Sequence, residues 1–473
     1  MTPVSPANPP SKETATLPLV RVLNSDLCVG CGICAGLSPS TLTMNVTPRG
    51  EYRPVLRDGQ QWADVPLPVQ EVCPFSGAGL NEDGLGKIEF AGKPGMSHSP
   101  KLGYFLRTEA AWVTDDARRI SSSAGGLGTW IVDYLLKNRI VDGVCCVTES
   151  ASNHALFEYR MVRSPEELAT SRKSKYYPVE MSQILGELAR SEGRYAVVTL
   201  PCFAKGLRQA MRVGLVPKER IHCIVGLFCG HLKTRQFAHY LIRNCGFDEK
   251  DAVAVDFRKK VLDDRASEYA FEAKARTAAG QIETRQVRMR DVSLGNWGLN
   301  GFMLKACECC DDVVAELADL SLGDAWLPEF VKDGRGTNLV VTRRADLAEM
   351  LDRGIASGEI ATRPVTPQAV IASQDGGFRQ RRQGLAYRLH LAQKNGEWRP
   401  PKRVAPDGRS LKLYSTLIQH LRIRIAEATK ANFLRHQGTP GLAPFERSIR
   451  GWVGLHNFVY RTRRSLMKLF RRT

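Results

Sequence analysis

The apolar residues of this chain follow two alternating patterns from about residue 104 onward. Short apolar runs at residues 141–147, 195–200 and 221–228 predict buried strands, and residues Asn338–Thr342 predict one more. Apolar residues at helical spacing predict helices over residues 127–137, 203–212 and 234–243. Strands that alternate with helices are typical of a mixed, largely parallel α/β domain.

The flanking segments have a different character, so we divide the chain into four parts. Residues 1–20 are rich in Pro, Ser and Thr and predict a disordered lead. Residues 21–90 are short, loop-rich and cysteine-containing, which predicts a small ferredoxin-like half-domain. Residues 101–375 hold the α/β pattern, and residues 379–473 predict a helical, basic C-terminal extension.

Length and composition predict a large protein whose cysteines are reduced. Its 473 residues are 43% hydrophobic, enough for more than one core. Residues 1–20 lack the apolar stretch of a secretory signal, and no uninterrupted apolar run reaches about 18 residues, the length of a membrane span. We therefore expect a cytoplasmic protein. Thirteen cysteines, an odd number, then favour metal binding over disulfides.

The basic excess belongs to the extension alone. From Arg379 to the end there are 22 Lys and Arg against 4 Asp and Glu, which equals the whole net charge of +18. Helical patterns cover residues 411–435 and 445–472, and the second places an apolar stripe among arginines and lysines: Trp452, Leu455, Val459, Leu466 and Phe470. Such a helix suits an anionic membrane surface, with the protein peripheral on the inner face. The alternative is a helix packed on the body with a solvated charged face. Nucleic acid is a weaker partner, because no binding module accompanies the charge.

The first candidate metal site is the segment D-L-C-V-G-C-G-I-C, which contains Cys28, Cys31 and Cys34. This C-x2-C-x2-C spacing is that of bacterial ferredoxins, whose fourth cysteine in the run ligates a second cluster. Ser38 stands at that fourth position, and a Cys-Pro pair follows only at Cys73. We therefore predict one 4Fe–4S cluster on these four cysteines. A zinc site built from the same cysteines is the alternative.

A second set of thiols is dispersed along the α/β domain. Cys202 and Cys229 each follow a predicted strand, where parallel sheets bind ligands, and Cys307 and Cys310 form a C-x2-C turn. These four predict a second cluster. The alternative is that they are small buried apolar residues. We apply that interpretation to the cysteines inside strand or helix patterns and to one within the turn: Cys145, Cys146, Cys223, Cys245 and Cys309.

Three further features suggest a site for an anionic cofactor or substrate. Small residues open the helix at 127, namely Ser122, Ser123, Gly125 and Gly126, and such a turn can bind phosphate or act only as an ordinary helix cap. Arg258 and Lys260 could form a basic fork, or lie in a solvated loop. His231 is a weak candidate proton donor; otherwise it is a hydrogen-bond partner.

Together these segments resemble the coenzyme F-420 hydrogenase/dehydrogenase beta-subunit family over roughly residues 26–326. The resemblance rests on four motifs in order: S-S-A-G-G-L-G-T-W-I-V-D-Y-L-L-K-N-R-I-V-D-G-V, L-P-C-F-A-K-G-L-R, G-L-F-C-G-H, and C-E-C-C-D-D followed by A-D-L-S-L-G-D-A-W. It implies a flavin, usually FAD, between iron–sulfur centres and a two-electron substrate. It also implies that Cys202, Cys229, Cys307 and Cys310 bind a cluster and that Ser123, Gly125 and Gly126 form the flavin-side turn. The local Ser38-Pro39 and the basic extension depart from the family pattern.

We therefore expect an oxidoreductase that passes electrons from reduced ferredoxin, or another one-electron donor, through 4Fe–4S clusters and FAD to a small-molecule acceptor. A flavin suits this role because it accepts single electrons and delivers pairs. The alternative is an electron-transfer adaptor without a substrate site, serving a membrane-associated polysaccharide or lipid pathway. The turn at residues 122–126 discriminates, since an adaptor has no need of it.

Overall fold

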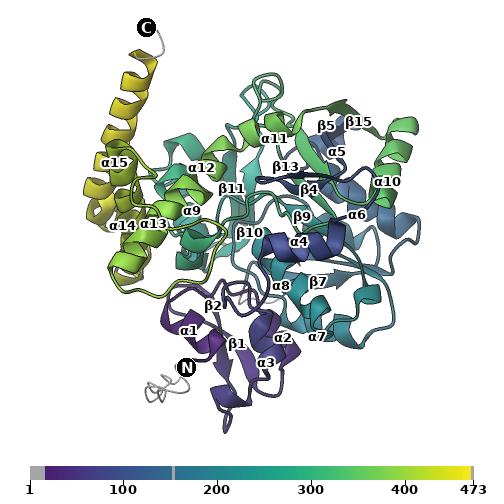
Figure 1. The fold of residues 1–473 in the computed structure, drawn as a ribbon. Coiled ribbons are helices and arrows are strands. Elements are labelled where there is room, and N and C mark those ends of the chain that lie inside the picture. Colours follow the sequence, from purple (N-terminus) through teal and green to yellow (C-terminus); the bar gives the residue numbers. More distant parts are fainter. Residues whose placement is uncertain (1–15, 152–154, 470–473) are drawn as a thin grey trace.

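The computed structural model describes residues 16–151 and 155–469, with side chains to residue 462 (Figure 1). Residues 1–15 of the predicted disordered lead lie outside these ranges. Its last residues, however, belong to helix α1 (Pro18–Asn24), where Leu19 and Val20 are buried. The lead therefore ends earlier than residue 20, because two apolar side chains near its end pack into a core.

The N-terminal segment forms a small unit at one end of the molecule (Figure 1, purple). Its two strands pair as an antiparallel hairpin, and short helices surround them: α2 (Ile33–Leu37), β1 (Leu42–Val46), β2 (Tyr52–Leu56), α3 (Leu67–Glu71) and, leading to the body, α4 (Glu82–Phe90). Two very short strands, β3 (Ser97–Ser99) and β4 (Gly103–Phe105), follow. This unit carries the first cysteine set.

An eight-stranded sheet organises the body. In spatial order its strands are β15 (Ile360–Pro364), β5 (Arg107–Val113), β14 (Asn338–Thr342), β13 (Leu320–Asp324), β9 (Ile221–Leu227), β8 (Tyr195–Thr199), β6 (Gly143–Glu149) and β7 (Phe157–Val162). The four central strands β13, β9, β8 and β6 pair in parallel, and the flanking pairs are antiparallel. The expected mixed α/β fold is confirmed, with the parallel pairing confined to the centre.

Helices cover both faces of this sheet (Figure 1). Helices α7 (Ser182–Arg190) and α8 (Pro201–Arg212) pack on one face, and α6 (Leu127–Lys137) and α10 (Ala345–Ala356) pack on the other. Successive strand residues enter opposite cores: Cys145 joins the core under α7 and α8, and Cys146 joins the core under α6 and α10. Both cysteines are therefore core residues, as the strand pattern predicts.

A second, antiparallel sheet was not predicted. It consists of β10 (Ala252–Lys259), β11 (Ala270–Arg276) and β12 (Ile282–Arg288), in that order, beside helix α9 (Arg235–Asn244). Its strands carry many charged residues, which hide the two-residue alternation of a half-buried strand. Arg258 therefore lies in a strand and not in a solvated loop.

The C-terminal region is helical, as predicted, and lies along one side of the body (Figure 1). After α11 (Pro367–Ser373) come α12 (Asp375–Arg381), α13 (Gln383–Lys394), and two long helices, α14 (Leu413–Arg435) and α15 (Ala443–Leu469). Within the described ranges, none of these helices is long and apolar enough to cross a bilayer.

The buried face of α15 differs from the predicted stripe. Phe445, Ile449, Val453, His456 and Val459 are buried, whereas Trp452 and Leu455 are 42% and 43% exposed. Leu466 and Phe470 lie beyond the described side chains. The first turns of α15 are thus packed on the protein, and the true packed stripe is rotated relative to the predicted one.

Candidate functional site

The first cysteine set lies in a tight loop of the N-terminal unit. Gly30 and Gly32 have φ values of +72° and +77°, a left-handed conformation that only glycine adopts without strain. The Gly30 amide donates to Cys28 Sγ at 3.4 Å, and backbone amides also face the sulfurs of Cys31, Cys34 and Cys73. Amides that point at sulfur are what the glycines of a cluster loop are expected to provide.

These four thiols converge in a region shielded from solvent. Cys31 and Cys34 are buried, and Cys28 and Cys73 are half-buried. Burial raises the pKa of Cys73 to about 12, with the Cys28 thiol contributing. Burial also raises the pKa of Cys34 well above its usual range, and the Cys31, Cys28 and Cys73 thiols raise it further. Four thiolates can share such a site only if a cationic group neutralises them.

The loop is pressed against the α/β domain. The Met181 amide donates to the Cys31 carbonyl at 3.0 Å. A side chain at Gly32 would meet the Ser182 amide at 3.0 Å, so glycine is required both by the backbone conformation and by this approach. The N-terminal unit and the body are therefore joined at the cysteine loop itself.

The second cysteine set gathers at the carboxyl ends of the central strands. Cys202 lies in the first turn of α8, directly after β8, and Cys229 lies two residues after the neighbouring strand β9. Cys307 and Cys310 lie in and just after a short 3-10 helix, Lys305–Cys309. Besides burial, the thiols of Cys310, Cys229 and Cys307 raise the pKa of Cys202. The structure thus brings together the four residues that the sequence selected, while Cys309 is buried in the core.

Polar groups surround this second set. The Leu232 amide donates to Cys307 Sγ at 3.3 Å. Arg381, from α12, is 3% exposed and hydrogen-bonds the Cys310 thiol. Burial opposes its charge, but the Cys310 and Cys229 thiols more than compensate, so the pKa of Arg381 is raised and it stays cationic. A buried cation faces the thiols, as a site for an anionic cluster requires.

The two sets are neighbours. The pKa of Cys202 is raised by burial, by its three partners in the second set, and also by the Cys31 thiol of the first. Among the described residues no three His, Cys, Asp or Glu side chains converge closely enough to hold a single metal ion. A cubane is held at its corners, so its ligands stand farther apart than those of one ion. Two sets of thiol donors are thus available in adjoining positions, and the clusters they would hold stay a prediction.

A large cavity of about 1290 Å³ opens beside the second set. It extends from the turn at residues 122–126, past Cys229, to the helices α14 and α15. This volume exceeds the roughly 300–1,000 Å³ of ordinary ligand pockets. It is large enough for a dinucleotide cofactor together with a second ligand.

The glycine turn at residues 122–126 borders this cavity and also packs closely against neighbouring backbone. Gly126 has φ +91° and precedes α6, and a side chain at Gly125 would meet the Ala111 carbonyl at 2.5 Å. The Ser122 hydroxyl donates to the Arg118 carbonyl at 2.9 Å, and the Ser123 hydroxyl accepts from the Ser174 amide at 2.6 Å. Both serines line the cavity, so their role toward a flavin stays a prediction, beside their part in shaping the turn.

Arg258 and Lys260 do not form a fork. Arg258 lines the cavity and bonds Asp324 at 2.7 Å, whereas Lys260 donates to the backbone carbonyls of Arg119, Ala124 and Arg335. Burial, followed by the charge of Arg258, lowers the pKa of Lys260 to about 7. Lys260 thus holds the glycine turn in place through the Ala124 carbonyl, and its role toward a ligand stays a prediction. Arg258 lies in β10, whereas Lys260 lies one residue beyond its end, after an irregularity in the pairing of the strand between Asp256 and Lys259.

His231 lines the cavity beside Trp297, with ring centroids 4.7 Å apart. Burial lowers its pKa well below the usual range, and Lys233, Arg381 and Arg422 lower it further. Its Nε2 is buried and has no hydrogen-bond partner in the part of the chain that the structure describes. His231 is therefore neutral near pH 7, which weakens its candidacy as a proton donor and leaves it a hydrogen-bonding group.

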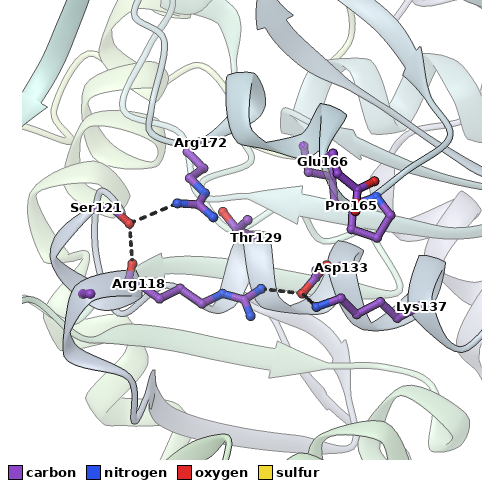
Figure 2. Close-up of a pocket in the computed structure, with 10 residues that line it drawn as sticks. Arg118, Ser121, Thr129, Asp133, Lys137, Pro165, Glu166 and Arg172 are labelled. Atoms are coloured by element: carbon purple, nitrogen blue, oxygen red, sulfur yellow. Dashed lines mark hydrogen bonds and ion pairs between the residues drawn. The ribbon is translucent and has the colours of Figure 1, made fainter.

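A smaller cavity of about 510 Å³ lies at the outer side of α6 (Figure 2). Three of its charged groups are paired with one another, since Arg118 and Lys137 both bond Asp133, at 2.9 and 3.0 Å. It contains neither a cysteine nor any of the predicted site residues. The larger cavity is therefore the candidate functional site.

Two site residues could not be found in the sequence. Arg381 lies in the basic extension, where it is one of 22 cations, and Lys233 is a lone lysine after the G-L-F-C-G-H motif. Lys233 is buried over the Trp297 ring at 4.8 Å, and burial lowers its pKa to about 7. The only sequence feature that could have indicated Lys233 is its position four residues after Cys229.

Two family models match the body of the chain. Residues 108–186 match the N-terminal model of the coenzyme F420 hydrogenase/dehydrogenase beta subunit, and residues 192–368 match the model of its C terminus. Together they cover more than half of the 473 residues. The chain belongs to this family. Membership makes it an oxidoreductase of an electron-transfer type, and it confirms the resemblance. The second cysteine set lies inside the matched residues, and the first set and Arg381 lie outside them.

Individual relatives are distant. The chain is 22% identical to coenzyme F420 hydrogenase subunit beta of Methanococcus voltae over 50% of this chain and 80% of the relative. It is 24% identical to coenzyme F420-dependent sulfite reductase of Methanocaldococcus jannaschii over 69% of this chain and 46% of that protein. A chain of the F420-reducing NiFe hydrogenase complex from Methanosarcina barkeri superposes with a TM-score of 0.48 at 19% identity, over 65% of this chain and 99% of the other.

Proposed function

We propose that the protein is an iron–sulfur flavoprotein that passes electrons from a one-electron donor, such as reduced ferredoxin, to a two-electron small-molecule acceptor. One observation carries this proposal: two sets of four cysteines adjoin each other, and the second borders a cavity large enough for a flavin and an acceptor. Cys28, Cys31, Cys34 and Cys73 would hold the entry cluster. Cys202, Cys229, Cys307 and Cys310 would hold the second.

FAD in this cavity would supply the conversion between single electrons and electron pairs. The chain's own residues prepare the site for it. Arg258 keeps a cation at the wall through its ion pair with Asp324, and the pKa of Arg258 is raised although burial opposes its charge. Its Nε is buried without a partner among the described residues, which leaves one donor for a ligand. The Ser122–Gly126 turn would lie against the phosphates.

The names of the relatives support a redox partner and an acceptor of the coenzyme F420 kind. Several are named subunits of a coenzyme F420 hydrogenase, which supports operation within a larger assembly, and one is named an F420-dependent sulfite reductase. Stopped-flow mixing of the anaerobic protein with reduced ferredoxin, and then with coenzyme F420, tests the scheme. Flavin bleaching followed by recovery on addition of an acceptor is expected. Cluster reduction without any flavin signal would refute it.

The adaptor remains the second candidate, because the first cysteine set alone would suffice to relay electrons to a partner. The cavity favours an enzyme, because an adaptor that only relays electrons does not need a ligand site beside its cluster. Dye reduction at a rate that depends on bound flavin is the discriminating measurement.

We also propose that helix α15, which begins the predicted segment 445–472, contacts an anionic membrane surface. Trp452, Leu455 and Phe458 are 42%, 43% and 68% exposed at three-residue intervals along α15. Exposed Arg447 and Arg450 lie on the same helix. Apolar and aromatic side chains beside arginines are typical of helices that lie in the membrane interface.

A further inference from the structure

A short segment of the C-terminal extension, residues 398–403, contacts the surroundings of both cysteine sets. It follows α13, and α13 is bonded to the second set, because Arg388 Nε donates to the Glu308 carbonyl at 2.9 Å. Glu308 lies between Cys307 and Cys310 in the sequence. The family models end at residue 368, so the whole segment lies outside the family match.

Lys402 lies between the loop that carries Cys73 and the turn that carries Cys310. Its side chain is 4% exposed, and its Nζ forms an ion pair at 3.5 Å with Asp311, one residue after Cys310. The same ammonium group lies 5.0 Å from the centroid of the Phe75 ring, two residues after Cys73. One buried cation therefore contacts both segments, through an ion pair on one side and a cation–π contact on the other.

Arg403 forms a second bridge one residue later. Its guanidinium donates two bonds to the Glu316 carboxylate, at 2.8 and 2.9 Å, and a third to Asp83 at 2.9 Å. Asp83 belongs to α4, the helix that leads from the N-terminal unit to the body, whereas Glu316 follows the second cysteine set. A two-point bond between arginine and a carboxylate fixes direction as well as distance. Arg403 therefore holds the two parts of the chain in one relative orientation.

Close packing accompanies these charges. Trp398 packs on the core that contains Phe75, and the guanidinium carbon of Arg21, in α1, lies 4.8 Å from the centroid of its ring. Gly77 has φ +73°, and a side chain there would meet Pro401 Cδ at 2.5 Å. The segment thus fits tightly against the N-terminal unit at both of its ends.

The carboxylates beneath the segment depend on its cations. Four of them are buried, namely Glu82, Asp311, Asp312 and Glu316. Removing one partner of a buried ion pair leaves an uncompensated charge, which destabilises the structure around it far more than the loss of a surface pair does. Loss of Lys402 or Arg403 should therefore open the Cys73 loop and the Cys310 turn together.

We propose that residues 398–403 act as a clasp that holds the Cys73 loop against the Cys310 turn and thereby fixes the separation of the two cysteine sets. Lys402 and Arg403 are positioning residues, because they act through these two segments and not on a substrate. The consequence for electron transfer rests on the proposed function, whereas the joining of the two segments does not. Electron transfer slows steeply with the separation of two centres, so the clasp sets the rate of passage between them.

Hydrogen exchange of the full-length holoprotein, measured by mass spectrometry, reports the opening of both segments. Lys402→Met keeps an unbranched side chain but removes its charge, and it should speed amide exchange at least about tenfold in residues 70–80 and 304–316 alike. Lys402→Arg restores the charge and should return most of the protection. Asp311→Asn should speed exchange in residues 70–80, although Asp311 belongs to the other segment.

Lys430→Met is the matched control. Lys430 also belongs to the extension, its side chain is also 4% exposed, and it pairs with the buried Glu51 at 3.6 Å. Neither residue lies in the Cys73 loop or the Cys310 turn, so exchange in both segments should stay within about twofold of the wild type. Faster exchange in only one of the two segments, or equal acceleration in Lys430→Met, would overturn the clasp.

Arg403→Lys is the second variant if Lys402→Met does not fold. It keeps one charge but loses the paired bonds to Glu316, so it should also speed exchange in both segments, and unchanged exchange would count against the clasp.

Electron paramagnetic resonance of the reduced holoprotein tests the consequence for the clusters. Splitting of the signals by magnetic interaction between neighbouring clusters should be lost or narrowed in Lys402→Met and kept in Lys430→Met. Unchanged splitting together with faster exchange would show that the clasp does not set the separation. Because exchange needs no cluster, a protein without iron would refute the proposed function, and the exchange measurement would still decide whether the clasp joins the two segments.

Discussion

Arg381 offers a direct test of whether the second cysteine set holds a cluster. It is 3% exposed, it hydrogen-bonds the Cys310 thiol, and its Nη2 donates to the Gly230 carbonyl at 2.6 Å. Replacing it by Gln removes one buried positive charge beside the proposed cluster. Because reduction adds a negative charge to a cluster, losing this cation must make reduction harder and lower the potential.

The expected size of the shift in reduction potential can be worked from Coulomb's law for a charge placed beside the cluster. A unit charge about 6 Å from the cluster centre, at an effective dielectric constant of about 20, interacts with an added electron by about 3 kcal/mol. For a one-electron couple this corresponds to a shift on the order of 100 mV. Arg381→Lys keeps the charge but loses the planar fork, so a much smaller shift is expected.

A redox titration followed by electron paramagnetic resonance measures both potentials in one sample. The first cluster serves as the internal reference and should keep its potential. Arg119→Gln is the matched variant. Arg119 is 4% exposed and also donates to a glycine carbonyl at 2.6 Å, but within the described ranges it has no thiol partner. No shift in Arg381→Gln, or equal shifts of both clusters, would show that the reasoning is wrong.

Three further outcomes are expected. Cys73→Ser should lower the iron content from about eight to about four per chain with flavin retained, whereas Cys309→Ser, which alters a buried cysteine outside both sets, should leave iron unchanged. Phe458→Ser should reduce flotation with anionic liposomes about tenfold or more, because a Phe side chain that is 68% exposed would lose its burial in lipid. Ile88→Ser, at a 56% exposed position on α4, should have no effect, and an equal loss in both variants would refute the membrane contact. Burial lowers the folded-state pKa of His239 to about 4. The unfolded chain therefore binds a proton that the folded chain does not, and the free energy of unfolding should fall as pH drops from about 6.5 to 4. The melting temperature of His239→Gln should depend less on pH over that window, and an unaltered slope would contradict the argument.

Much of the body could be predicted from sequence because its signals are local. The helix at Leu127–Lys137 and the strand at Asn338–Thr342 have the expected bounds, since each is an apolar pattern ended by polar or small residues. The meeting of Cys202 and Cys229 was also predictable, because neighbouring parallel strands end at one edge.

The remaining features depend on distant contacts. The second sheet could not be predicted because its many charged residues obscure the two-residue alternation that is typical of a strand. Lys260 reaches three carbonyls from separate segments, a partner set that no spacing reveals. The packed face of α15 depends on what lies beneath it: Phe445 stacks on Phe302 with centroids 5.8 Å apart, so that face turns inward and Trp452 turns outward.

The extension is the part least evident from sequence. Its charge suggests a solvated or membrane-facing tail, yet Arg381 is buried at the second thiol set and Lys402 is buried against Asp311 at 3.5 Å. A buried cation is stable only with a suitable partner, and those partners lie far away in the sequence. Composition therefore indicates the charge of the extension but not that it completes the site.

The central claim is that two adjoining cysteine sets hold two clusters beside a bound flavin. Quantifying iron, acid-labile sulfide and flavin in the anaerobically reconstituted full-length protein tests this most directly. The account predicts about eight iron, about eight sulfide and about one flavin per chain. About four iron without flavin, or zinc in place of iron, would contradict it.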